Sequence, residues 1–313
     1  MHNHRLILPW LVLACVPLLA QEPSAATPET KKPEMSASPD LSHDANGKLS
    51  QEQMQQLFRV VADKDLENDK KLRDYTYLEY WEEHKLDGAG QTKSIESKTS
   101  EVLELYGEQV RRLIEKNHKP LDAKEAAKEE ARIQKIVDKH KGESEEEQRK
   151  RREKEDKDRA EGREFVREIA DAYNFTLTGT EVIDGREAWA ISAEPRPEFV
   201  PHVKDAKYLS KFHGRVWIDR ADQQLTKMDM ECLDTISWGL FLARLHKGTR
   251  ILLEQTRVND EVWLPKHVTA KIDARLALLM GINLSVEQSY RDYKKFHTSA
   301  KIVGFKELGP PAK

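Results

Sequence analysis

The sequence predicts an α+β fold: a curled antiparallel sheet that forms an incomplete barrel, closed by helices and carrying a charged helical insertion. Three observations lead to this prediction. Short segments that alternate apolar and polar residues follow one another from about residue 174 to 297, separated by turn residues. Apolar residues at helical spacing begin after Ser50. A stretch rich in Ala, Lys, Glu and Arg fills residues 122–172 without a proline.

The segment after Asn174 reads as a series of hairpins. FTLTGTEVI and REAWAISAEP flank an Asp184-Gly185 turn, and RILLEQTRV joins EVWLPKHVTAKID at Asn259-Asp260. Between them GRVWIDRADQQLTKMDMEC turns back on itself, and after them RLALLMGIN and SVEQSYRDYKKF form a longer pair. An earlier hairpin is expected within residues 73–110, around the turn GAGQ. With few helices left to cover so long a sheet, we expect it to curl around the apolar residues of one face.

Eight apolar residues at alternating strand positions are the candidates for that face, since side chains two apart on a strand point the same way. Their spacing leaves open whether they fill a core or line a cavity. They are Trp189, Ile191, Val216, Ile218, Ile251, Leu253, Leu276 and Leu278.

Two helical regions precede and interrupt the sheet. Ser50 and Gln53 make a capping box ahead of an apolar series, Met54, Leu57, Phe58 and Val61. The insertion is expected to span residues 119–172. Its middle, residues 143–164, has no apolar residue except Ala160, so it has no face to bury and reads as a solvated helix or a partly disordered bridge. Apolar stripes on its flanks predict a helical hairpin whose ends touch the rest of the molecule.

The N-terminus has the plan of a secretion signal: a weakly basic start, an apolar run from Leu6 to Ala20, and then polar residues. The run is shorter than the about 20 apolar residues that a spanning helix needs. We therefore expect cleavage near Ala20 and a periplasmic or secreted protein, with residues 21–49 as a disordered tether and residues 50–313 as one domain. The competing interpretation is an outer-membrane lipoprotein signal that uses Cys15.

Composition and motifs exclude several classes of function. The formal net charge of −3 gives no concentrated excess of Lys and Arg, so no nucleic-acid partner is predicted. The sequence has no HExxH, GxSxG, P-loop or GxGxxG motif, and its eleven histidines are scattered. We predict no metal, no cofactor and no enzymatic activity. A carboxylate site of the glycosidase kind stays open, because none of the 55 acidic residues is singled out. Cys232 is interpreted as a small buried residue.

A succession of motifs resembles the periplasmic lipoprotein-carrier superfamily typified by LolA and LolB, and in particular its outer-membrane lipoprotein-sorting type. The motifs are VIDGREAWAISAEPRP, GRVWIDRADQQLTKMD, the Lys247-Gly248 step into RILLEQ, VWLP and YRDYKKF, within about residues 174–297. The resemblance implies an incomplete barrel whose apolar concave face shelters acyl chains in water. The insertion and the long tether depart from the compact carrier. The carrier's functional arginine is not assigned here, because four residues are possible: Arg186, Arg215, Arg250 and Arg275.

The sequence analysis thus predicts a non-enzymatic binder of lipid or lipoprotein acyl chains, with envelope proteins as further partners through the charged insertion. The rival hypothesis is an envelope scaffold with a filled core and the insertion as its contact surface. An enzyme with an unrecognised carboxylate site is the third. Within the matching motifs, Arg186 and Asp219 are interpreted as turn residues.

Overall fold

The computed structural model describes residues 49–238, 243–276 and 280–296. The predicted signal (1–20), Cys15, nearly all of the predicted tether and Leu278 lie outside these residues. Among the helices in the described part of the chain, none is long and apolar enough to span a membrane.

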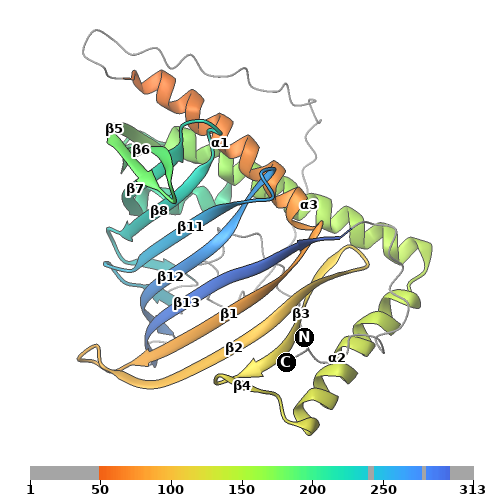
Figure 1. Ribbon diagram of the computed structural model, residues 1–313. Coiled ribbons are helices and arrows are strands. Elements are labelled where there is room, and N and C mark those ends of the chain that lie inside the picture. Colours follow the sequence, from red (N-terminus) through yellow and green to blue (C-terminus); the bar gives the residue numbers. More distant parts are fainter. Residues whose placement is uncertain (1–48, 239–242, 277–279, 297–313) are drawn as a thin grey trace.

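One antiparallel sheet of thirteen strands dominates the molecule (Figure 1). Its order is β4-β3-β2-β1-β13-β12-β11-β8-β7-β6-β5, and the β9–β10 hairpin joins it through β12. The sheet curls but does not close, since β4 and β5 remain its two edges, which confirms the predicted incomplete barrel. The strand bounds are β1 Tyr75–Leu86, β2 Thr92–Leu105, β3 Glu108–Lys116, β4 Lys119–Pro120, β5 Tyr173–Ile183, β6 Arg186–Pro195, β7 Phe212–Asp219, β8 Leu225–Cys232, β9 Ile236–Trp238, β10 Ala243–Leu245, β11 Arg250–Val258, β12 Val262–Leu276 and β13 Met280–Lys295.

Four of the predicted hairpins are confirmed: β1–β2 around GAGQ, β5–β6, β7–β8 and β11–β12. Their turns have the backbone geometry that their residues favour. Asp184 and Gly185 have φ values of 48° and 79°, and Asn259 and Asp260 have 50° and 56°. Two residues with positive φ in a short hairpin loop match the right-handed twist of the strands, which is why Asn, Asp and Gly are found there.

Several strand boundaries differ from the prediction. The strand expected to run to residue 110 ends at Leu105, and the chain reverses at Tyr106 and Gly107 into β3, which the sequence analysis missed. Segments EVWLPKHVTAKID and RLALLMGIN were predicted as separate strands. In the structure the first segment continues into the second as one strand, β12, which ends at Leu276. The end of the second segment belongs to β13, which begins at Met280. The short strands β4, β9 and β10 were not predicted either.

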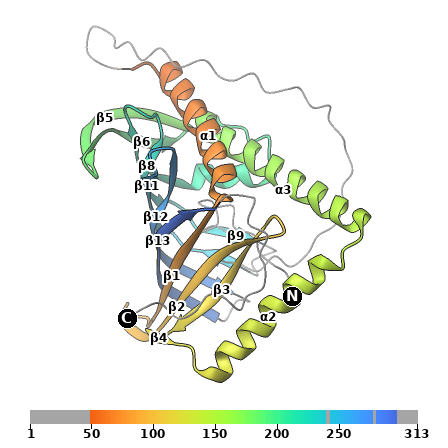
Figure 2. The ribbon, with the colours of Figure 1, turned by 45° about the vertical axis from the view of Figure 1, so that its right-hand side comes forward.

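Helix α1 (Gln51–Leu72) lies across the concave side of the sheet, against β5 and β12 (Figure 2). The predicted capping box is present: Ser50 Oγ accepts from the Gln53 backbone N–H at 3.1 Å, and Gln53 Oε1 accepts from the Ser50 N–H at 2.8 Å. The apolar face of α1 is buried, and Phe58 stacks on Phe175 of β5 with ring centroids 3.6 Å apart. Burial of this face holds the helix on the sheet.

The insertion consists of two helices, α2 (Ala123–Lys141) and α3 (Glu145–Ala172). They do not lie side by side as a hairpin; both views show them meeting at a corner (Figures 1 and 2). Both helices contact the body, and so does the corner between them, where Arg151 donates to the Tyr106 backbone oxygen at 3.1 Å and the His140 ring stacks on Tyr106. Ile133 and Val137 of α2 pack on Leu105 and Val110, and the last turns of α3 join the main core. A short 3₁₀ helix, η2 (Lys204–Lys211), lies beside α3.

We call the sheet with α1 and η2 the body, and residues 123–164 the arm. Residues 145–164 of the arm are mostly exposed and form a continuous helix, so the alternative of a partly disordered bridge is not observed.

Candidate functional site

The predicted apolar face is the concave face of the sheet beneath α1. Trp189 is paired with Ile218, and Ile191 with Val216, across β6 and β7, and Ile251 and Leu253 lie on β11. These six side chains are only 0 to 7% exposed and belong to the two largest core clusters.

Side chains from the helices fill the space that these residues face. Met54 and Leu57 of α1 and Leu209 of η2 lie in the same core cluster as Trp189 and Ile191. Leu276 is the last residue of β12, paired with Met280 of β13. The structure therefore describes this part of the concave face as a packed core.

The concave face continues past α1 onto β13, where apolar side chains are less well covered. Ile282, Leu284 and Val286, here called the β13 strip, are each half-buried. Their partners on β12, Ala274, Ile272 and Ala270, are buried at 6%, 8% and 3% exposure.

The position of the helices explains the difference. Helix α1 lies against β12 and α2 against β3, so β13, β1 and β2 run between the two helices. Trp81 of β1 pairs with Gln288 and extends the strip, with Lys98 Nζ 4.8 Å from its ring centroid.

The four candidate arginines all occupy positions whose side chains point away from the concave face. Three of them are next to a residue of the main core on their own strand: Arg215 beside Val216, Arg250 beside Ile251 and Arg275 beside Ala274. Arg186 alternates in step with Ala188 and Ala190, on the face opposite to Trp189 and Ile191. Arg250, for example, donates from Nε to Asp229 Oδ1 at 2.6 Å on the convex side. Any contact of these arginines with a ligand would therefore be on the convex surface.

Arg186 and Asp219 form a network at a turn. Arg186 donates from Nε to Asp219 Oδ2 at 2.6 Å and from Nη2 to Oδ1 at 2.9 Å, and Oδ1 also accepts from the Asp222 backbone N–H at 2.7 Å. Burial favours a raised pKa for Asp219, but these bonds outweigh it and hold the pKa below its usual value. The contacts support the interpretation of both residues as turn chemistry.

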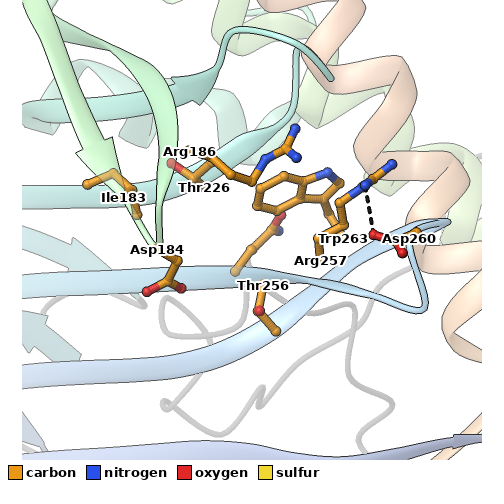
Figure 3. Close-up of a pocket in the computed structure, with 9 residues that line it drawn as sticks. Ile183, Asp184, Arg186, Thr226, Thr256, Arg257, Asp260 and Trp263 are labelled. Carbon is orange, nitrogen blue, oxygen red and sulfur yellow. Dashed lines mark hydrogen bonds and ion pairs between the residues drawn. The ribbon is translucent and has the colours of Figure 1, made fainter.

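A pocket of about 220 Å³ lies beside this network, between the β5–β6 and β11–β12 turns (Figure 3). Its walls include Trp263, Arg186, Arg257, Thr256, Asp184 and Gln255. The sequence analysis did not identify it. The predicted hairpin at Asn259-Asp260 brings Trp263 of the VWLP motif close to Arg257, but no spacing in the sequence connects either residue with Arg186 on β6.

Other reactive side chains of the described chain have ordinary structural surroundings. Burial raises the pKa of the Cys232 thiol, and Sγ lies 3.0 Å from the Asp234 carbonyl oxygen, so the thiol is protonated and packed. Within the described ranges no group of three or more His, Cys, Asp and Glu side chains is placed to hold a metal ion.

No protein-family model matches the sequence, and no curated protein matches it. Solved structures do show similarity. A putative outer membrane lipoprotein-sorting protein domain from Vibrio parahaemolyticus has 13% identity and a TM-score of 0.27, covering 77% of this chain and 95% of its own. A DUF1329 family protein from Desulfovibrio piger has 8% identity and a TM-score of 0.28, covering 79% and 95%. A LolA superfamily protein from Nitrosomonas europaea has 8% identity and a TM-score of 0.23, covering 76% and 94%.

Two of these three descriptions match the superfamily that the sequence motifs resemble. The TM-scores lie well below 0.5, so the likeness assigns no role to any residue of this chain.

Proposed function

We propose that the protein is an exported, non-enzymatic binding protein that takes up acyl chains on the concave face, at the β13 strip. One observation carries the proposal: Ile282, Leu284 and Val286 are half-buried, whereas the residues beside them on β12 are buried. Export is inferred from the signal-like start of the sequence, and acyl chains as cargo from the resemblance of the motifs.

The energetics suit such a ligand. Each methylene group that leaves water contributes about 0.8 kcal/mol, so one chain of moderate length laid along three strand positions binds without a polar anchor. The four candidate arginines point to the convex side. On the concave face the charges nearest the strip are Glu83 and Lys85 of β1, which pair with Val286 and Leu284 and lie 3.9 Å from each other, and Lys98 beside Trp81.

The packed core beneath α1 favours a second candidate, the envelope scaffold. Ile191 and Ile218 are fully buried under the helix, and residues 145–164 present a long charged surface. In that case the concave face is core throughout, and the arm is the contact surface for another envelope protein.

Titration with a fluorescent fatty acid separates the two candidates. We expect binding to the purified protein, and we expect Leu284→Asp to weaken it at least about tenfold, because a carboxylate in the strip must be desolvated. The matched control is Ile95→Asp: Ile95 is an apolar residue on the convex side, 53% exposed, and its substitution should leave binding unchanged.

Native mass spectrometry of protein purified from its own envelope adds the identity of the cargo. Loss of a lipid mass on denaturation supports the carrier. If no fatty acid binds, or if Leu284→Asp binds as well as the unaltered protein, the scaffold is the better conclusion.

A further inference from the structure

The pocket beside Trp263 is separate from the concave strip and has a different chemistry. At about 220 Å³ it is smaller than the about 300 to 1,000 Å³ typical of sites for drug-sized ligands, so it suits a single small ring and not an acyl chain. Two arginines and two aspartates line it, Arg186, Arg257, Asp184 and Asp260, so the lining carries no net charge.

One carboxylate oxygen holds the pocket walls in place. Asp222 Oδ2 accepts from Trp263 Nε1 at 3.0 Å and lies 3.0 Å from Arg257 Nε and 3.1 Å from Arg186 Nη2. The Arg186 guanidinium also lies over the Trp263 ring, 5.6 Å from its centroid. Three side chains from β6, β11 and β12 are therefore fixed before any ligand arrives, which lowers the cost of ordering a binding site.

The guanidinium groups are already neutralised by carboxylates. Arg186 is paired with Asp219 and Asp222, and Arg257 with Asp222 and Asp260. An anion would have to compete with these carboxylates. A neutral ligand with hydroxyl groups can instead accept from the remaining guanidinium N–H groups and donate to the carboxylates, because a hydroxyl does both.

A buried acceptor in the wall lacks a partner. Gln255 lines the pocket at 4% exposure; its Nε2 donates to Asp65 Oδ1 at 3.2 Å, but its Oε1 has no hydrogen-bond partner among the described residues. Leaving such an atom unsatisfied is costly, so a ligand that brings an O–H or N–H group to it gains affinity. Figure 3 shows the Thr256 side chain among the sticks of the same pocket.

We propose that this pocket binds a neutral polyhydroxyl ring, such as one sugar unit of a glycan, packed against Trp263 with its hydroxyl groups on Gln255 Oε1 and on the arginine and aspartate side chains. An aromatic wall surrounded by fixed donors and acceptors matches a ring that has both C–H and O–H groups. The site lies apart from the β13 strip and does not depend on acyl binding.

Saturation-transfer NMR on the purified protein tests the proposal, with methyl α-glucoside, N-acetylglucosamine and inorganic phosphate as probes. For one ring we expect a Kd of about 1 mM for at least one sugar and weaker binding of phosphate. Gln255→Leu removes the unpaired acceptor at nearly constant size and should weaken the sugar more than about tenfold. Thr269→Val on β12, outside the pocket, is the control and should change nothing.

Two results overturn the proposal: no saturation transfer to either sugar, or tighter binding of phosphate than of both sugars. Equal sugar affinity in Gln255→Leu and in the unaltered protein also overturns it. The two sugars differ by an acetamido group, so their ranking distinguishes the kind of glycan. Leu284→Asp should leave sugar binding unchanged, which keeps this test independent of the acyl test.

Discussion

Helix α1 of the body and the first part of α3 in the arm are both regular and both well capped, yet different forces hold them. Helix α1 buries Met54, Leu57 and Phe58 against the sheet. Over residues 145–164, α3 instead has exposed ion pairs such as Lys150–Glu146, and its capping box is Ser144 with Glu147. Pairs of this kind contribute about 0.2 to 0.5 kcal/mol each. Burial makes α1 part of the cooperative core, whereas local interactions maintain the arm.

The largest effect is expected in the body. Trp189→Ala should lower the free energy of unfolding by about 3 to 5 kcal/mol, because the indole is 7% exposed inside the main core and its removal leaves a cavity. Urea unfolding followed by circular dichroism measures the change. A loss below about 1 kcal/mol would mean that the core beneath α1 is not packed. It would favour the alternative in which Trp189 lines a cavity for acyl chains.

A pH-dependent effect is expected at Asp65 on α1. Burial, opposed by the bond from Gln255, raises the pKa of Asp65 from 3.8 to about 6. The folded protein therefore keeps this proton at pH values where the unfolded chain has lost it. Stability falls as the pH rises from about 4 to about 6 and stays lower above that range.

Asp65→Asn should remove this loss. Relative to the unaltered protein, the variant should gain up to about 3 kcal/mol at pH 7.5 and only about 1 kcal/mol at pH 4.5, in urea unfolding at both values. An equal difference at the two pH values would show that the carboxyl is solvated, and that α1 fits the sheet less closely than the structure indicates.

The smallest global effect is expected in the arm. Ile133 is fully buried between α2 and the β2–β3 hairpin, so Ile133→Ala should speed amide exchange in residues 123–141 by about 10- to 100-fold. The free energy of global unfolding should change by less than about 1 kcal/mol. The exposed control Lys150→Ala should stay within about 0.5 kcal/mol and leave exchange unchanged. A loss of body stability equal to that of Trp189→Ala would show that the arm and body unfold together.

The elements that the sequence predicted well are those with local signals. The capping box at Ser50, the Asp184-Gly185 turn and the Asn259-Asp260 turn each depend on residues a few positions apart. The turn into β3 was missed because Tyr106 adopts a positive φ, which a tyrosine rarely does, inside a run that otherwise reads as one strand.

The pocket could not be predicted, because its parts meet only through strand pairing. Asp222, Arg257 and Trp263 come together because β8 pairs with β11 and β11 with β12. Alternation within strands predicts only that Trp189 and Ile191 share one face of the sheet. It could not show that α1 fills the space in front of them, since that depends on the angle at which the helix crosses the sheet.

The last strand of the described residues lies in the middle of the sheet. Strand β13 joins β1 on one side to β12 on the other, and Tyr75 meets Lys295 across 220 positions of sequence. Until residues 280–295 have been synthesised, β1–β4 and β5–β12 remain two half-sheets with unpaired edges, and closing so long a loop is slow. A chain built in this way cannot complete its fold while it is still being made. Until then the unpaired edges of the two half-sheets are the points at which aggregation would begin.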